Sequence, residues 1–347
     1  MTDWDGESIV TRRDPETGAW IFIALHSSRL GPSTGGTRMI AYADLESARV
    51  DAMRLSSGMT YKWAAAGFPR GGGKGVIAAP PGLGPARRDA LLRRYGALVA
   101  ELAGRFWTGA DAGTSARDMD VIAETGAPYV FSRTPENGGA GGSGPWTALG
   151  VSGAIEAVCR RLFGESGTTG RTVLVQGTGS VGRPLIERLA GSGARVLFAD
   201  VAPEAGGGLP GTGIPADEAL SIPCDVLAPC ALGAVLSART IPTLSCRAVV
   251  GAANNQLAEP EDAERLRERG ILYAPDFVVN AGGAIAITGI ESLGWSPERA
   301  EREVRGIADT LVRILDLAER EGISTEAAAR RLAESRLNAA ENHDRLD

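Results

Sequence analysis

The sequence predicts an α/β protein of two domains, a mixed-sheet domain followed by a doubly wound parallel sheet. Its 347 residues are enough for two domains of medium size. A stretch rich in Gly and Pro, 138–145, interrupts the chain as a linker would. After it, helical stretches alternate with short apolar runs, which is typical of a parallel sheet covered by helices. We expect the domains over 1–138 and 139–324, with a terminal helix over 325–347 that packs back on the first.

The first domain is predicted from one apolar run and one amphipathic helix. Residues 19–25 have the length of a strand and its content of β-branched and aromatic side chains. Over 85–102, apolar residues recur at helical spacing and arginines occupy the other face. We therefore expect a mixed sheet that begins with 19–25, and a surface helix over 85–102.

The second domain is predicted from six apolar runs of strand length. These runs are 172–176, 195–199, 225–228, 248–250, 271–273 and 277–279. Beyond them, 297–320 and 325–341 carry Leu, Ile and Ala at helical spacing beside dense charge. The runs predict the strands of a parallel sheet, and the last two segments predict long helices.

Composition and charge exclude several classes of function. Forty-two acidic against 36 basic residues give a formal charge of −6. This balance lacks the cationic surplus that binding to nucleic acid or to an anionic membrane requires. No apolar stretch approaches the roughly 18 residues of a membrane span, and the acidic N-terminus does not resemble a signal peptide. We expect a cytoplasmic protein whose partners are small molecules.

Cysteine and histidine are too few and too dispersed for several kinds of site. The four cysteines, at 159, 224, 230 and 246, form no CxxC pair, so we expect buried thiols and no metal site. His26 and His343 are the only histidines. A Ser-His-Asp triad, a zinc site on HExxH and a histidine base for hydride transfer therefore all lack their central residue. An enzyme with this sequence must move protons through Lys, Asp, Glu or Tyr.

A dinucleotide-binding motif follows the first predicted strand of the second domain. The run 172–176 leads directly into Gly177-Thr178-Gly179-Ser180-Val181-Gly182, and a helical stretch follows. Gly177 allows a tight turn, Gly179 the close approach of a pyrophosphate, and Gly182 the packing of helix on strand. The next strand ends in Asp200, whose carboxylate can bind the adenosine ribose hydroxyls and would repel a 2′-phosphate. The motif predicts NAD rather than NADP, and a glycine turn without a ligand is the alternative.

Small residues and amides follow the other predicted strands of this domain. In such a sheet, ligands bind beyond the carboxyl ends of the strands. The segments at these ends are 228–233, 251–255 and 280–283. Each alone is typical of an ordinary turn, but together they would let a flat ring approach and would supply neutral hydrogen bonds.

Two lysines of the first domain lie among glycine and apolar residues instead of on a charged face. They are Lys62, which ends the run 58–62, and Lys74, which follows three glycines. A free lysine titrates near 10.4, but burial and a neighbouring cation can lower its pKa by several units. One lysine could then hold a substrate carboxylate while the other acts as a neutral base. Two solvated surface lysines are the alternative, which leaves the triple glycine unexplained.

A carboxylate, Asp111, lies among small residues after the predicted surface helix. Its surroundings, 108–114, read Thr-Gly-Ala-Asp-Ala-Gly-Thr and predict a loop. Asp111 could orient a water molecule or exchange a proton with an amine. An isolated Asp in a loop is more often a turn or cap residue.

Together, these segments resemble the Glu/Leu/Phe/Val dehydrogenase family over nearly the whole chain. The resembling stretches are 30–32, 35–38, 58–74, 108–120, 138–150, 175–182, 228–233, 251–256 and 270–283. The resemblance implies reversible oxidative deamination of an L-amino acid to a 2-oxo acid and ammonia with a nicotinamide cofactor. It also implies a homo-oligomer, and a catalytic cleft between a substrate-binding and oligomerisation domain and a Rossmann-type NAD-binding domain.

The resemblance also implies roles for single residues. Lys74 would activate water on the imine, Asp111 would exchange protons with the amino nitrogen, and Lys62 would bind the substrate carboxylate. The other substrate-binding positions would be Gly35, Gly36, Asn254, Gly109, Ala284 and Ile287. The cofactor positions would be Gly177, Gly179, Ser180, Val181, Gly182, Asp200, Thr147, Cys230, Ala231, Ala252 and Asn280, with Thr147 and Asn280 beside the nicotinamide.

The amino acid itself is predicted from the positions that line the side-chain pocket in the family. By resemblance, these positions are Gly109, Ala284 and Ile287 in this chain. The branched-chain enzymes of the family have Ala and Val at the first two of these positions. Gly109 and Ala284 would therefore leave room for a ring. Residues 4–7 and 293–295 also resemble actinobacterial phenylalanine dehydrogenases. We predict L-phenylalanine, with leucine, valine or tryptophan as alternatives and a non-catalytic NAD-binding regulator as the alternative of a different class.

Overall fold

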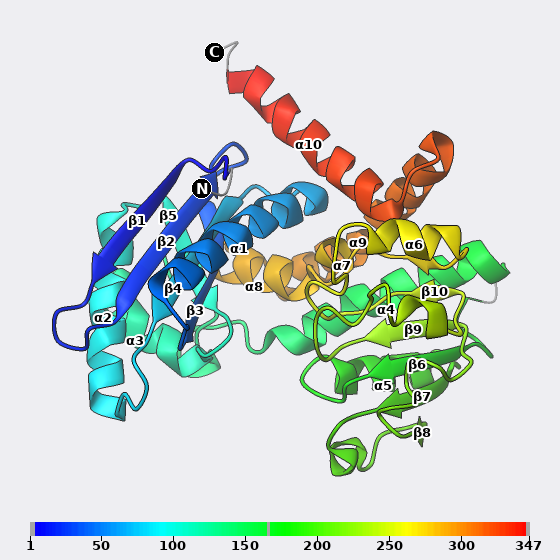
Figure 1. Ribbon diagram of the computed structural model, residues 1–347. Helices are drawn as coiled ribbons and strands as arrows, with labels where there is room; N and C mark the ends of the chain where they lie inside the picture. Colours follow the sequence, from blue (N-terminus) through cyan, green and yellow to red (C-terminus); the bar gives the residue numbers. More distant parts are fainter. Residues whose placement is uncertain (1–3, 165–166, 345–347) are drawn as a thin grey trace. The chain divides into compact units, whose positions relative to one another are not determined.

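The computed structural model describes residues 4–164 and 167–344, which form two compact units (Figure 1). The first unit comprises Met1–Gly141, Ile287–Trp295 and Ala333–Asp347, and the second comprises Gly142–Ala286 and Ser296–Leu332. Each unit has its own sheet, mixed in the first and parallel in the second, so the predicted α/β fold of two domains is confirmed. In the described part of the chain, no helix has the length and apolarity to cross a membrane.

The described part of the first unit is built on a five-stranded sheet of order β1-β2-β4-β3-β5. β1 pairs antiparallel with β2 and β2 with β4, whereas β3 runs parallel to both β4 and β5. The carboxyl ends of β3, β4 and β5 therefore lie at the same edge of the sheet. The strands are β1 (Ser8–Arg13), β2 (Trp20–Ser27), β3 (Ser33–Ile40), β4 (Gly71–Ala78) and β5 (Phe106–Ala110).

Helices cover both faces of this sheet (Figure 1). On one face, α1 (Leu45–Ala66) packs on β4 and β2. On the other, α2 (Pro85–Glu101) and α3 (Ala116–Gly126) pack against each other and on the strands. The core under α1 includes Phe22, Ala24, Ala48, Ala52 and Val76. The core under α2 and α3 includes Leu91, Leu92, Tyr95, Phe106 and Ile122.

Local signals fix the ends of these helices. The Asp44 carboxylate accepts a hydrogen bond from the N–H of Ser47 at 2.7 Å and begins α1, which ends at Gly67 in the left-handed conformation. Ser115 and Asp118 form a reciprocal capping box at the start of α3. The predicted strand over 19–25 and helix over 85–102 are confirmed as β2 and α2. The expectation that the sheet begins with 19–25 is wrong, because β1 precedes it and pairs with β2.

The second unit contains, in its described part, a six-stranded parallel sheet of order β11-β10-β9-β6-β7-β8. Its first strand in the chain, β6, lies in the interior of the sheet, as in a doubly wound fold. The strands are β6 (Thr172–Gln176), β7 (Arg195–Ala199), β8 (Thr212–Gly213), β9 (Val226–Pro229), β10 (Ala248–Val249) and β11 (Leu272–Tyr273). The helices are α4 (Ser143–Phe163), α5 (Gly182–Gly191), α6 (Asp262–Glu268), α7 (Asp276–Val279) and α9 (Pro297–Glu321).

Two helices contribute residues to both units. They are α8 (Gly282–Leu293) and α10 (Thr325–Asp344). Short 3-10 turns occur at Pro135–Asn137, Pro203–Gly206 and Ile241–Thr243.

The structure corrects two predicted elements and one predicted environment. The run 277–279 is not a strand, because it lies in the short helix α7 after Pro275; three apolar residues carry too little periodicity to separate the two. Residues 143–145 of the predicted linker form the first turn of α4, where Pro is tolerated. Of the four free cysteines only Cys159 is buried, and the other three are half-buried.

Candidate active site

The sheet of the first unit brings three charged side chains together near the carboxyl ends of its parallel strands. Arg38 lies on β3, Lys74 lies on β4, and Asp111 follows β5 directly. Side chains alternate along a strand, so Lys74 projects to the same face as position 72. That face is covered by α1, because a Cβ at Gly72 would lie 1.9 Å from Oγ1 of Thr60. Strand register and alternation thus place the cluster under α1.

Lys74 and Arg38 share one oxygen of Asp111. The Nζ of Lys74 lies 3.0 Å from Oδ2 of Asp111, and the Nε of Arg38 lies 2.9 Å from the same atom. Only 5% of Lys74 is exposed, and this burial lowers its pKa although the Asp111 carboxylate opposes the shift. Burial alone would raise the pKa of Asp111, but the two cations hold it below its usual value. The cluster thus joins an ionised carboxylate to an amine that loses its proton more readily than a free lysine.

The glycines before Lys74 are required by close packing. A Cβ at Gly71 would lie 2.0 Å from the carbonyl oxygen of Ser27 on β2, as impossible a distance as that at Gly72. The triple glycine therefore has a backbone reason, as the sequence predicted. Lys62 is half-buried and belongs to α1, the same helix that packs on β4 and covers Lys74.

Gly35 and Gly36 are also glycines for steric reasons. A Cβ at Gly35 would lie 1.9 Å from the carbonyl oxygen of Gly73, and one at Gly36 would lie 2.8 Å from Cβ of Asp111. The bare backbone of β3 at these positions therefore lets Asp111 lie close against the sheet beside Lys74.

Basic-residue usage singles out the same two lysines. Of the 36 lysines and arginines, 34 are arginine, and Lys62 and Lys74 are the only lysines. Arginine stays protonated in proteins, whereas a buried lysine can lose its proton. Lysine thus appears only at the two positions for which the resemblance implies contact with substrate. The rarity of lysine is a signal in the sequence that we did not use, and Arg38 was not predicted as a neighbour of Asp111.

Gly109 does not provide the space that the sequence analysis expected. A Cβ at Gly109 would lie 2.4 Å from Cε2 of Phe131 and 2.7 Å from Oγ of Ser132. The expectation that the missing side chain of Gly109 makes room for a substrate ring is wrong, because Phe131 fills that room. Of the other two predicted pocket positions, Ala284 is half-buried in the second unit and Ile287 is buried in the first.

In the second unit, the glycine motif forms the turn between β6 and α5. Gly177 has φ of +101°, which favours glycine. A Cβ at Gly182 would lie 1.9 Å from the carbonyl oxygen of Gly177, so helix and turn are in close contact. Apart from Gly179 itself and its two neighbours in the chain, no described residue has an atom within 4 Å of the Cβ position of Gly179. The turn thus combines tight packing with one open position, as the approach of a pyrophosphate requires.

Asp200, at the end of β7, is bonded to the same turn. Its Oδ2 accepts hydrogen bonds from the backbone N–H of Thr178 at 2.7 Å and from the Thr178 hydroxyl at 2.9 Å. Its Oδ1 accepts one from the N–H of Ala202 at 3.1 Å. The backbone bonds from Thr178 and Ala202 lower the pKa of Asp200, so the group is ionised at neutral pH. Asp200 therefore fixes the turn as well as presenting charge, and Thr178 is a partner that our sequence analysis missed.

Two other predicted cofactor residues, Cys230 and Ala252, follow strands β9 and β10 of the same sheet, whereas Asn280 follows the short helix α7. The side-chain amide of Asn280 donates to the carbonyl of Ala252 at 3.1 Å and to Oδ1 of Asn254 at 2.8 Å. The N–H of Cys230 donates to the carbonyl of Gln176 at 2.7 Å. The structure thus links Asn280, Ala252 and Asn254 directly, and it bonds Cys230 to the end of β6.

Contacts around the turn connect further predicted positions. A Cβ at Gly177 would lie 2.8 Å from that of Ala231, and one at Gly144 on α4 would lie 2.1 Å from the carbonyl oxygen of Ser180. Val181 is the N-cap residue of α5, which begins at Gly182. On α4, the Thr147 hydroxyl accepts a hydrogen bond from the N–H of Gly283 at 3.2 Å. The start of α4 therefore packs on both the turn and the start of α8.

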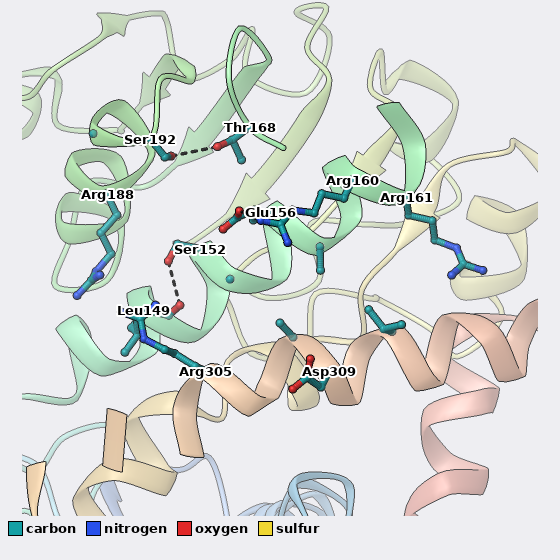
Figure 2. Close-up of a pocket in the computed structure, with 15 residues that line it drawn as sticks. Leu149, Ser152, Glu156, Arg160, Arg161, Thr168, Arg188, Ser192, Arg305 and Asp309 are labelled. Carbon is teal, nitrogen blue, oxygen red and sulfur yellow. Dashed lines mark hydrogen bonds and ion pairs between the residues drawn. The ribbon is translucent and has the colours of Figure 1, made fainter. Parts of the chain in front are cut away.

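A cavity of about 770 Å³ elsewhere in the second unit lies among α4, α5 and α9 (Figure 2). Of the described residues, 15 line it, and none of these is a predicted site residue. Three of its arginines, Arg160, Arg161 and Arg188, lie in the last turns of α4 and α5, where cations stabilise helix carbonyls. Arg160 pairs with Glu156, and Arg161 pairs with Asp316 at 2.7 Å. Helix ends and ion pairs thus account for its charge.

Comparison with known proteins decides the family. Residues 11–127 match the family model described as Glu/Leu/Phe/Val dehydrogenase, dimerisation domain. Residues 208–344 match the model described as Glutamate/Leucine/Phenylalanine/Valine dehydrogenase. Leucine dehydrogenase of Thermoactinomyces intermedius is 41% identical over 344 residues, which cover 97% of this chain and 92% of that protein. The chain belongs to the Glu/Leu/Phe/Val dehydrogenase family.

Further members agree with this assignment. Valine dehydrogenase of Streptomyces coelicolor is 42% identical over 341 residues, covering 96% of this chain and 93% of that protein. The crystal structure of L-tryptophan dehydrogenase from Nostoc punctiforme has a TM-score of 0.85 at 37% identity and covers 98% of each chain. The chain is thus an amino acid dehydrogenase, and the match to a dimerisation domain supports the predicted homo-oligomer. The assignment to phenylalanine stays a prediction.

Proposed function

We propose that this dehydrogenase catalyses the NAD-dependent oxidative deamination of an apolar L-amino acid to its 2-oxo acid and ammonia. The observation that carries the proposal is the buried contact of 3.0 Å between Lys74 and Asp111. Proton transfer without histidine needs an amine that can become neutral and a carboxylate that is ionised before it accepts a proton. Burial and the shared cation Arg38 favour these two states.

Each residue of the site has one task in this reaction. Lys62, as an ammonium, binds the substrate carboxylate. A nicotinamide held beside Thr147 and Asn280 would supply the hydride acceptor for oxidation of the substrate Cα–N bond to an imine. Lys74, as a neutral amine, takes a proton from the water that adds to the imine carbon. Asp111 exchanges protons with the amino nitrogen, so that the nitrogen leaves as ammonia.

The second unit supports NAD as the cofactor. Gly179 leaves the turn open where a pyrophosphate would approach the start of α5. Asp200 is ionised beside that turn, where it would accept hydrogen bonds from ribose hydroxyls and repel a 2′-phosphate. Thr147 and Asn280 would flank the nicotinamide, and Asn254, bonded to Asn280, would help to hold the substrate.

L-Phenylalanine is the first candidate substrate, and only one of the two pocket positions that favoured it still does. Ala284 still supports a large side chain, but the space beside Gly109 is filled by Phe131. Leucine and valine form a second candidate class, favoured by this filled space and by the names of the relatives from Thermoactinomyces and Streptomyces. One methylene is worth only about 1–3 kcal/mol of discrimination, so activity toward several apolar amino acids is expected.

A substrate panel tests both parts of the proposal. NADH formation is measured with L-phenylalanine, leucine, valine and tryptophan, each with NAD and with NADP. A higher kcat/KM for phenylalanine than for the aliphatic substrates supports the aromatic assignment, and the reverse order transfers it to the second class. Inactivity toward every amino acid with either cofactor would overturn the proposed reaction in favour of a non-catalytic NAD-binding regulator.

A further inference from the structure

We propose that Arg38 is a positioning residue that holds Asp111 on Lys74 and, through its fixed charge, keeps the carboxylate ionised and the lysine free to lose its proton. The inference rests on the proposed function, because it concerns the proton states that this function needs. It gives Arg38, Asp51 and Tyr42 an indirect part in the reaction: Asp51 and Tyr42 hold Arg38, and Arg38 holds Asp111. None of the three is proposed to touch the substrate.

Arg38 is fixed between two carboxylates. Its Nε donates to Oδ2 of Asp111 at 2.9 Å, and its Nη1 donates to Oδ2 of Asp51, on α1, at 2.9 Å. The Tyr42 hydroxyl donates to the same Asp51 oxygen at 2.8 Å, and Nη2 of Arg54 donates to the other one at 2.8 Å. Arg38 therefore cannot turn away from Asp111 without breaking a second ion pair that has two supports of its own.

Arg38, held in place by Asp51, also fixes the orientation of the Asp111 carboxylate. Arg38 and Lys74 both reach Oδ2, while the backbone N–H of Asp111 donates to Oγ1 of Thr114 at 2.9 Å. With one oxygen held by two cations, the other remains available to the amino nitrogen of a substrate. The planar guanidinium can bond two carboxylates from different nitrogens at once, whereas a lysine ammonium is a flexible point charge.

The charge of Arg38 also acts on Lys74. A second cation beside Asp111 competes with Lys74 for the carboxylate and disfavours protonation of the lysine. The same cation lowers the pKa of Asp111. The other groups that face this cluster are Asp51, whose pKa is lowered by Tyr42, Arg54 and Arg38 despite burial, and Tyr42, whose pKa burial and Asp51 raise. Asp51 is thus an anion and Tyr42 a neutral donor, and both fix Arg38.

The direction of the expected pH effect follows from these signs. Oxidative deamination needs Asp111 ionised and Lys74 neutral, so both requirements fail on the acid side. Removing the guanidinium raises the pKa of Asp111 and also that of Lys74. The acid limb of the pH profile of kcat/KM therefore moves to higher pH, and activity is recovered when the pH is raised.

The test compares Arg38→Gln with Arg94→Gln in the intact protein. Arg94 is a matched control, because its Nε and Nη1 also bond two carboxylates, those of Asp14 at 2.6 Å and Glu16 at 2.9 Å, away from the cluster. Arg38→Gln removes the positive charge, so we expect the acid limb to rise by about one pH unit, hence a loss of about tenfold on that limb that disappears at high pH. Arg94→Gln should keep the wild-type profile. An equal loss at every pH, or an unchanged profile, in Arg38→Gln would overturn the inference.

A second measurement keeps the inference testable where activity is weak. Because the chain has two lysines, labelling with ε-¹³C-lysine gives two side-chain resonances, which Lys74→Arg assigns. The pKa of Lys74 should rise in Arg38→Gln, which keeps the number of lysines at two. It should rise less in Tyr42→Phe, which removes one hydrogen bond to Asp51 and keeps the guanidinium of Arg38. A Lys74 titration unchanged in both variants rejects the role of Arg38. A shifted titration in a protein inactive toward every amino acid would instead reject the proposed function alone.

Discussion

The first unit prepares its site with buried charges, and the second prepares its site with bare backbone. Lys74 and Arg38 each have a nitrogen within 3.0 Å of the same oxygen of Asp111. Around the Gly177 turn, by contrast, the contacts are made by glycines, amides and carbonyls, with Asp200 as the charged member. In the proposed reaction, the first site is therefore controlled by which groups carry protons, and the second by shape.

This contrast follows from what each site has to do. Chemistry at an imine needs groups that change protonation, so their environment must shift pKa values. Binding a dinucleotide needs close approach of backbone N–H groups to phosphate, so side chains must be absent there. Variants of the first site should therefore change turnover and its pH dependence, whereas variants of the second should change stability or cofactor affinity.

The largest effect is expected when Lys74, the titrating group of the first site, is replaced by another cation. Lys74→Arg keeps a cation near Asp111 but cannot supply a neutral amine, because arginine stays protonated. We expect turnover to fall by about 10²- to 10⁴-fold, as in Lys74→Ala, while NADH binding measured by fluorescence is unchanged. Near-normal turnover in Lys74→Arg would show that Lys74 serves only as the ion-pair partner of Asp111.

The next effect separates packing from ligand approach in the second unit. Gly182→Ala places a methyl group 1.9 Å from the Gly177 carbonyl oxygen, and we expect it to lower stability by about 1–3 kcal/mol. Gly179→Ala adds the same group in open space, so thermal unfolding should be unchanged while affinity for NAD falls. Measured unfolding temperatures and Kd values check both. If Gly179→Ala bound NAD as tightly as the wild type, the open position would not be the pyrophosphate site.

The smallest effect concerns the charge of the second site. Asp200→Asn keeps a side-chain oxygen to accept the Thr178 bonds but removes the repulsion of a 2′-phosphate. We expect the ratio of kcat/KM for NADP over NAD to rise about tenfold, or 1.4 kcal/mol.

Asp225→Asn is the control for this change. Asp225 accepts a hydrogen bond from the N–H of Thr172 at 2.7 Å, at the other end of β6. The Asp225→Asn substitution should leave the ratio of kcat/KM for NADP over NAD unaltered. An unaltered ratio in Asp200→Asn as well would assign cofactor choice to another group.

Local patterns carried most of what the sequence could predict. Strands 172–176 and 195–199 coincide with β6 and β7, because apolar runs between turn residues describe buried parallel strands. The glycine motif and the two lysines could be singled out because these residue types are unusual in their surroundings. The prediction for 277–279 was wrong because three residues are too few to show a period, and the segment is helical.

Residue types alone indicated which groups could do the chemistry, because two lysines among glycine and apolar residues stand out in a chain with two histidines. Which groups act on one another depends on the folded chain. The register of β3, β4 and β5 places Arg38 beside Asp111, and α1 adds Asp51 from a separate element. The folded chain also determines that Phe131 occupies the space beside Gly109. Such contacts join residues far apart in the chain, and pairing and packing, not local spacing, bring them within reach.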